Sequence, residues 1–139
     1  MANSEAQFRQ ELLKDARKLG YHAEPNVSDF DIGRPDCFIK ALDFPTIWIE
    51  LKFIRSVGRK INLSAQQRNW AKKHRSVGGH SMWAVCVKLR VYQWELYVGT
   101  EFDEDVTHVK HGELLQCKGI GETWDVDGLL RLTNNRRTY

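Results

Sequence analysis

Residues 33–53 read GRPDCFIKALDFPTIWIELKF. Apolar and polar side chains alternate along two runs of this stretch, which predicts strands over Asp36–Ala41 and Thr46–Phe53. Residues 42–45 separate the two runs, and their composition favours a turn. The stretch is therefore expected to form a β-hairpin, around which the other elements are arranged.

The register of this hairpin follows from its side chains. Placing Asp36 opposite Glu50 makes one face wholly apolar, because the pairs along it are then Cys37 with Ile49, Ile39 with Ile47, and Ala41 with Pro45. A slip of one residue would mix the two faces. The hydrophobic pattern thus predicts a second face that carries Asp36, Phe38, Lys40, Trp48, Glu50 and Lys52.

Helical and strand patterns continue on both sides of the hairpin. A capping box at Ser4 begins a predicted helix over Glu5–Leu19, and Ser64 begins another that runs to about His74. Strands are predicted near Tyr21–Ala23, Met82–Leu89, Gln93–Val98, Val106–Val109 and Leu114–Cys117, with a helix near Val126–Leu132. The order helix, β-hairpin, helix, strand predicts an α/β fold, a mixed β-sheet flanked by helices.

Length and composition limit the class of protein. A chain of 139 residues, 42% hydrophobic, is expected to form a single domain over residues 1–139. No apolar run approaches the roughly 20 residues of a membrane helix, and the polar N-terminus does not resemble a signal peptide. Three widely spaced cysteines without a CxxC pair favour free thiols. We expect a protein without membrane contact, located in the cytoplasm.

Positive charge is concentrated in one segment. Residues 52–75 contain eight Lys and Arg residues and no acidic residue, although the net charge of the chain is only +3. A solvated face is the plain interpretation, but the segment begins at Lys52 and is better explained as a surface that faces phosphates. The candidate nucleic-acid-binding residues are Arg34, Arg55, Arg59, Lys60, Arg68, Lys72 and Lys73.

The polar face of the hairpin has the groups that phosphodiester hydrolysis needs. Asp36 and Glu50 supply carboxylates and Leu51 a carbonyl oxygen, which are the ligands that Mg²⁺ prefers. Lys52 lies two residues after Glu50, about 7 Å along the strand, and could stabilise negative charge that develops on a phosphate. The alternative is a surface ion pair between Glu50 and Lys52, with Asp36 as a turn residue.

Three short motifs together resemble one enzyme superfamily. Residues 33–36 (GRPD), 49–52 (IELK) and 63–64 (LS) with Gln67 are similar to motifs of the PD-(D/E)xK nucleases, particularly the small virus-type replication-repair (VRR-NUC) nucleases and phage junction-resolving endonucleases. The resemblance implies a restriction-endonuclease-like core. It also implies that Asp36 and Glu50 bind Mg²⁺, for which Mn²⁺ can substitute, that Lys52 is the catalytic lysine, and that Gln67 reaches the site.

Two of these implied positions have alternatives. Gln67 is also placed to complete a capping box with Ser64, and one side-chain conformer is not expected to serve both roles fully. The family usually adds a glutamate from the first helix. At 100° per residue, Glu5 falls on the apolar stripe of that helix and Glu11 points away, so Glu5 is preferred over Glu11 and Asp15. Its alternative role is a solvated acid in the first turn.

The function expected from these patterns is a metal-dependent DNA endonuclease. With little chain left for reading bases, we expect selectivity for DNA shape, such as branched or Holliday-junction DNA in replication, recombination or repair. A homodimer would supply two active sites, and a phage-encoded protein would work in the host-cell cytoplasm. Alternatives are a nicking or single-strand-specific nuclease that acts as a monomer, or a non-catalytic nucleic-acid-binding module.

Other residues with reactive or stacking side chains have structural explanations. His108 and His111 would be spaced as a metal pair only on a helix, and their surroundings favour a strand edge with solvated histidines. Most of the five tryptophans are expected in the core. Trp48 is the exception, because the predicted register places it on the Glu50 face, where it could stack on exposed bases.

Overall fold

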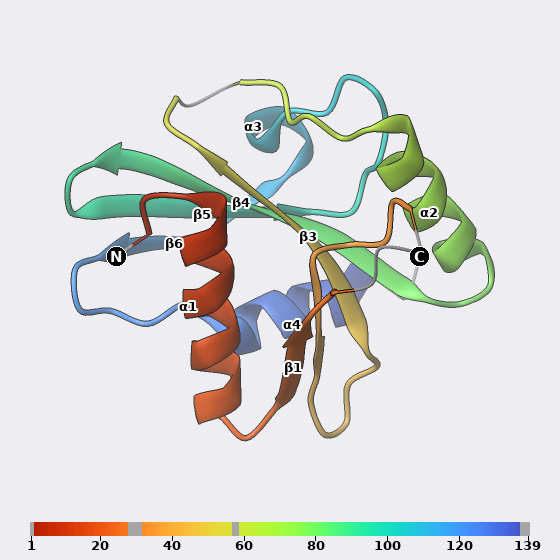
Figure 1. Ribbon diagram of the computed structural model, residues 1–139, viewed down its shortest axis with the longest axis horizontal. Helices are drawn as coiled ribbons and strands as arrows, with labels where there is room; N and C mark the ends of the chain where they lie inside the picture. The colour runs from red at the N-terminus through yellow and green to blue at the C-terminus, as the bar shows by residue number, and fades with distance from the viewer. Residues whose placement is uncertain (1, 28–31, 57–58, 137–139) are drawn as a thin grey trace.

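A mixed sheet forms the centre of the computed structural model, which describes residues 2–27, 32–56 and 59–136 (Figure 1). The described residues build a six-stranded sheet in the order β1-β2-β3-β4-β5-β6, antiparallel except for the parallel pair β3 and β4. The strands are β1 (His22–Pro25), β2 (Cys37–Lys40), β3 (Ile47–Ile54), β4 (His80–Arg90), β5 (Gln93–Gly99) and β6 (Glu113–Gly119).

Helices cover this sheet on both faces. They are α1 (Glu5–Lys18), α2 (Ala65–Ser76), α3 (His108–His111) and α4 (Val126–Arg136), and Figure 1 shows α1 and α2 on either side of β3. The predicted α/β fold, a mixed sheet flanked by helices with the order helix, β-hairpin, helix, strand, is confirmed. Within the described residues, no helix has the length and apolar character needed to cross a membrane.

Two buried clusters hold the helices against the sheet. The larger one joins the apolar faces of α1 and α4 to one face of the strands, through residues such as Phe8, Leu12, Ile39, Ile49 and Leu129. The smaller one lies on the opposite face, under α2, and includes Ile61, Leu63, Ala71, Trp83, Val85 and Val87. Burial of these side chains removes apolar surface from water, which is the main force that fixes α1 and α2 in place.

The predicted hairpin register is confirmed. Cys37 pairs with Ile49, Phe38 with Trp48 and Ile39 with Ile47. Cys37, Ile39, Ile47 and Ile49 are fully buried in the cluster that α1 covers. The period of two along each strand then leaves Trp48, Glu50 and Lys52 on the other face, toward α2. The face that gathers charged residues is the one that the sequence predicted.

The strand predicted over Val106–Val109 is wrong. Residues 108–111 form the one-turn helix α3, because the Thr107 side chain accepts the N–H of Lys110 at 3.2 Å and His111 Nδ1 accepts the N–H of Thr107 at 3.0 Å. The expectation of solvated histidines also fails for His108, which is buried with its ring 4.6 Å from that of Tyr97. These local capping bonds outweigh the strand preference of the flanking valines.

Candidate functional site

Two carboxylates and a backbone group meet where β2 begins. Asp36 directly precedes β2, and its Oδ2 accepts the N–H of Leu51 in β3 at 2.8 Å. The N–H and C=O of one residue in a strand point to the same side, so the carbonyl oxygen of Leu51 also faces the side of Asp36. The structure therefore brings Asp36, Glu50 and Leu51 together at one end of the hairpin.

Glu50 is a buried carboxylate with a strongly shifted pKa. Glu50 is only 2% exposed. Its Oε1 accepts a hydrogen bond from Gln67 Nε2 at 3.1 Å, whereas its Oε2 is buried without a donor within the described part of the chain. Burial first, and then the neighbouring Asp36, raise the pKa of Glu50 well above its ordinary value, whereas Lys52 opposes the shift. When protonated, Glu50 can share its proton with Asp36.

Gln67 contacts both the helix cap and the site. Its Oε1 accepts the N–H of Ser64 at 2.9 Å, and its own N–H donates to Ser64 Oγ at 3.1 Å, which completes the predicted capping box. The amide nitrogen is left free to donate to Glu50. The expectation that one conformer could not fully serve both roles is wrong, because the two roles use opposite ends of the amide.

Lys52 lies on the same strand face as Glu50, two residues further along β3. Its side chain is half-buried, and its positive charge lowers the pKa of both Glu50 and Glu5. The ammonium group is therefore electrostatically coupled to the carboxylates that the sequence grouped with it.

Glu5 is the acid of α1 that faces this site. Glu5 is exposed at the surface, but loss of solvent on its inner side and the nearby Asp36 raise its pKa, while Lys52 and Arg9 act in the opposite direction. Arg9 was missed from the sequence, although its position four residues after Glu5 on a helix is the spacing of an ion pair.

The other acids of α1 are used elsewhere. Glu11 accepts the indole N–H of Trp124 at 3.2 Å, and Asp15 accepts the backbone N–H of Trp124 at 2.8 Å. These bonds tie α1 to the segment that leads into α4. They leave Glu5 as the helix-one acid that interacts with Asp36 and Glu50.

The donor set fits a hard cation that takes few protein ligands. Among the described residues, no three His, Cys, Asp or Glu side chains form a complete cage. Mg²⁺ commonly takes one or two carboxylates and completes its octahedron with water and substrate oxygens. The Glu50 carboxylate lies beside Asp36, and no hydrogen bond from the described residues satisfies its buried Oε2. A divalent cation between the two carboxylates would relieve their repulsion.

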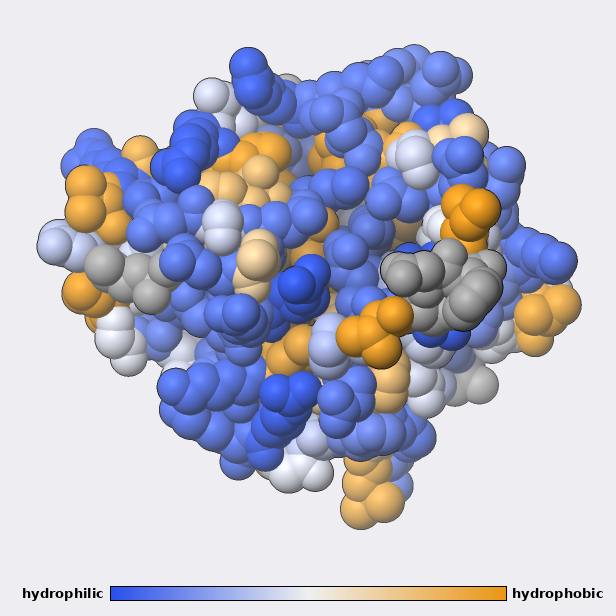
Figure 2. All heavy atoms as spheres, viewed as in Figure 1, coloured by the Kyte–Doolittle hydropathy of each residue, from blue (hydrophilic) through white to orange (hydrophobic). Residues whose placement is uncertain are grey.

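The basic segment is partly paired with acidic residues of a distant loop. Lys60 lies 3.2 Å from Asp105 and Lys72 lies 3.2 Å from Asp103, both at the surface. Figure 2 shows hydrophilic side chains along the top of the view, over the segment that leads into α2. Such exposed pairs are weak and leave the lysines available to a phosphate.

The arginines predicted to bind nucleic acid make different contacts within the protein. Arg34 lies 5.2 Å from the ring of Trp48, and Arg55 donates to the carbonyl of Asn3 at 2.9 Å. Arg68 donates to a backbone carbonyl of the preceding loop at 2.7 Å. The remaining predicted basic residues, Arg59 and Lys73, are exposed.

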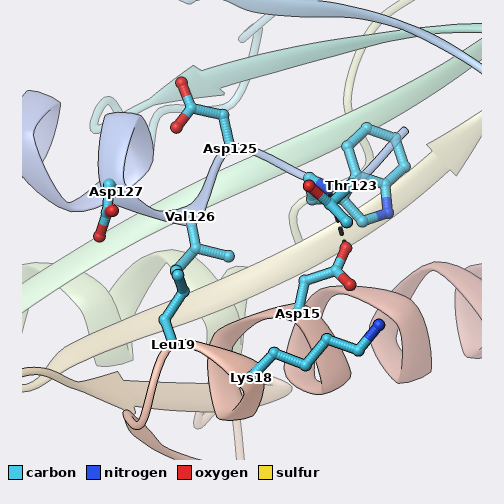
Figure 3. A pocket seen from close by; sticks show the side chains of 8 residues that line it. Asp15, Lys18, Leu19, Thr123, Asp125, Val126 and Asp127 are labelled. Carbon is cyan, nitrogen blue, oxygen red and sulfur yellow. Dashed lines mark hydrogen bonds between the residues drawn. The ribbon is translucent and has the colours of Figure 1, made fainter.

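A separate pocket of about 320 Å³ lies between α1 and the start of α4 (Figure 3). It is acidic, but its carboxylates already have structural partners. Asp15 accepts the N–H of Trp124, Asp125 accepts a backbone N–H in the first turn of α4 at 2.9 Å, and Asp127 accepts a hydrogen bond from Tyr21. Asp125 therefore caps the start of α4, and Asp15 and Asp127 connect α1 and the residue Tyr21 to the α4 region.

The chain has a likeness among solved structures, but none among protein families or curated proteins. No protein-family model matches the chain, and no curated protein matches it. Among solved structures, Hjc, a Holliday junction resolvase from the archaeal hyperthermophile Archaeoglobus fulgidus, is similar with a TM-score of 0.45 and 22% sequence identity, over 66% of this chain and 70% of that chain. A likeness of this size assigns no activity.

Proposed function

We propose that this protein is a metal-dependent DNA endonuclease of the PD-(D/E)xK type. The observation that carries the proposal is the buried Glu50, which lies beside Asp36 and whose Oε2 lacks a donor among the described residues. Burial of an unsatisfied carboxylate next to a second one destabilises a fold. A cation-binding role explains why both acids are present on this face, together with Lys52.

Each residue of the site has a proposed role. Asp36, Glu50 and the Leu51 carbonyl would hold Mg²⁺, with Mn²⁺ as a substitute. The ion would supply a nucleophilic water near neutral pH and charge stabilisation at the phosphate. Lys52 would place a positive charge beside the reacting phosphate, which stabilises the transition state more than the ground state.

The two remaining residues are assigned supporting roles. Gln67 would hold Glu50 in one orientation through its amide nitrogen, since its oxygen is fixed by the helix cap. Glu5 would add negative charge at the edge of the site, where a second cation or an ordered water could bind. The first proposal follows from the hydrogen bond of Gln67 to Glu50, and the second from the electrostatic effect of Asp36 on Glu5.

The substrate proposed is branched or Holliday-junction DNA, in replication, recombination or repair. Exposed Arg59 and Lys73, with Lys60 and Lys72, would contact phosphates, which position DNA without reading its sequence. Two sites in a homodimer would allow paired cuts. A non-catalytic DNA-binding module is less well supported, because two acids beside a phosphate weaken binding unless a cation neutralises them.

Cleavage assays with matched variants test this proposal. Labelled four-way junction, linear duplex and single strand are incubated with Mg²⁺ or with a chelator, using the wild type, Asp36→Asn and Lys52→Ala. Asp43→Asn in the exposed turn of the hairpin and Lys110→Ala on α3 change the same residue types away from the site. We expect Mg²⁺-dependent cutting that the first two variants lose and the controls keep. Cutting that survives both site variants would refute the assignment.

A further inference from the structure

Five rings form a continuous aromatic row beside the candidate site. The ring centroids are 5.1 Å apart between His22 and Phe38, 5.2 Å between Phe38 and Trp48, 5.8 Å between Trp48 and Trp70, and 4.6 Å between Trp70 and His74. The row crosses β1, β2 and β3 and ends on α2. Residues far apart in the sequence therefore build one aromatic surface.

The aromatic row is not part of either buried core. Trp83 and Trp94 are almost completely buried, as the sequence predicted for most tryptophans. Phe38, Trp48 and Trp70 are only half-buried and belong to neither hydrophobic cluster. Packing of the core therefore does not account for a phenylalanine and two tryptophans on this face.

The aromatic row lies next to the carboxylates of the candidate site. Trp48 precedes Glu50 by two residues on β3 and shares its face, so the two side chains are separated by about 7 Å along the strand. Trp70 follows Gln67 by three residues on α2, which places both on the same helix face. Gln67 contacts Glu50 and Trp70 contacts Trp48, so the row continues directly from the candidate site.

A positively charged side chain, Arg34, lies beside the aromatic row. The guanidinium of Arg34 lies 5.2 Å from the Trp48 ring centroid, and Arg34 also donates to the side chain of Asn26. The preceding Gly33 has a φ of 87°, and a Cβ there would lie 2.3 Å from the carbonyl oxygen of Gln66. Only glycine allows the loop to approach α2 this closely, and this approach fixes the position of Arg34.

We propose that the aromatic row binds unpaired bases of a DNA strand whose phosphate lies at Asp36 and Glu50. This inference rests on the proposed nuclease function and names its substrate class: DNA that carries single-stranded nucleotides next to the cleaved bond, as in forks and flaps. The bases of a continuous duplex already stack on one another, whereas unpaired bases expose faces that aromatic rings can contact. Arg34 adds a cation next to the strand's phosphates.

Equilibrium binding without metal tests this inference separately from cleavage. Fluorescence anisotropy compares a forked DNA with a thymidine arm and a blunt duplex of equal length, in chelator, for the wild type, Phe38→Leu and Trp70→Leu. Tyr92→Ala changes an exposed aromatic residue at the tip of the β4–β5 hairpin and is the control. We expect tighter binding of the fork by the wild type. Each row variant should weaken fork binding by about tenfold and duplex binding far less, because one base stack is typically worth a factor of that order.

A second measurement on the wild type removes the risk that a variant is misfolded. Photocrosslinking of 5-bromodeoxyuridine placed in the single-stranded arm should label peptides that contain Phe38, Trp48 or Trp70. Crosslinks confined to other peptides, or equal binding of fork and duplex, would overturn the inference even if the protein cuts DNA. Fork binding through the row in a protein that cuts nothing would support the inference and refute only the nuclease proposal.

Discussion

Gln67 donates from Nε2 to Oε1 of the buried Glu50 at 3.1 Å, while its own Oε1 accepts the backbone N–H of Ser64 at 2.9 Å. One amide group thus joins the N-terminal cap of α2 to the carboxylate at the centre of the candidate site. Because a backbone N–H can only donate, the cap dictates which end of the amide faces Glu50. The start of α2 therefore fixes the orientation of Glu50.

Gln67→Glu should separate helix capping from site function. Glutamate at this position can still complete a capping box, so α2 should keep its cap, while the added charge beside Glu50 should lower the free energy of unfolding in chelator. The new carboxylate would meet Glu50 without a donor, and we expect cleavage to fall by roughly a hundredfold, in line with the loss of an outer-shell partner of a metal ligand. Thermal unfolding and single-turnover cleavage measure the two effects.

Ser64→Ala is the converse control, with about 1 kcal/mol lost from stability and a smaller loss of activity. Equal activity losses in both variants would contradict this role.

Glu50→Gln should stabilise the metal-free protein at pH 8. The change removes a carboxyl group that must take up a proton on folding at this pH, because burial and Asp36 disfavour its charge, and it keeps the acceptor for Gln67. We expect a gain of about 1–3 kcal/mol in the free energy of unfolding, the usual cost of an uncompensated buried polar group. Chemical denaturation in chelator measures this gain. Glu104→Gln, at an exposed position, should change stability by less than about 0.5 kcal/mol. A Glu50→Gln protein less stable than the wild type would exclude a repulsive carboxylate pair.

The stability of the metal-free protein should fall as pH rises above the ordinary pKa of glutamate. The folded-state pKa of Glu50 is raised, so in the interval between its unfolded and folded values the native state holds a proton that the unfolded state has lost. This stabilising contribution is complete below the unfolded value and disappears as pH passes the folded one. Melting temperatures in chelator between pH 5 and 9 should therefore show a decline in the wild type that Glu50→Gln reduces. Parallel profiles would show that Glu50 does not titrate in this range.

The acidic loop at residues 103–105 should weaken DNA binding. Asp103 and Asp105 pair with Lys72 and Lys60 at the surface, so their neutralisation removes two charges that repel phosphates and that compete weakly for these lysines. Asp103→Asn with Asp105→Asn should raise affinity several-fold and steepen the dependence of affinity on salt, by about one unit of slope for each additional phosphate that a lysine neutralises. Anisotropy titrations over a salt series measure both. Asp43→Asn should leave the slope unchanged, and weaker binding by the double variant would contradict this model.

The sequence predicted the hairpin well because its information is local. A period of two with one wholly apolar face allowed a single register, and the structure has that register, with Cys37 opposite Ile49. Contacts between distant segments were not encoded in this way. The pairing of Lys60 with Asp105 and the packing of Trp70 on Trp48 depend on how α2 and the 103–105 loop settle on the sheet.

Individual hydrogen bonds explain where the structure differs from the predictions made from the sequence. The pattern of Val106–Val109 favoured a strand, but hydrogen bonds around Thr107 form a one-turn helix instead. Capping and contact with Glu50 are incompatible only if the Gln67 amide acts as one group, whereas its oxygen and nitrogen act independently. In both cases the deciding contacts are individual hydrogen bonds, which hydrophobic periodicity does not report.

The rate at which Glu50→Gln cuts a four-way junction in Mg²⁺, relative to the wild type, tests the central claim most directly. This substitution keeps the size of the side chain and its bond to Gln67 but removes the charge that a cation requires. We predict Mg²⁺-dependent cutting by the wild type and a rate at least about a hundredfold lower for a folded, DNA-binding Glu50→Gln protein. Cutting by Glu50→Gln at the wild-type rate would contradict the assignment of this carboxylate to a metal-dependent nuclease site.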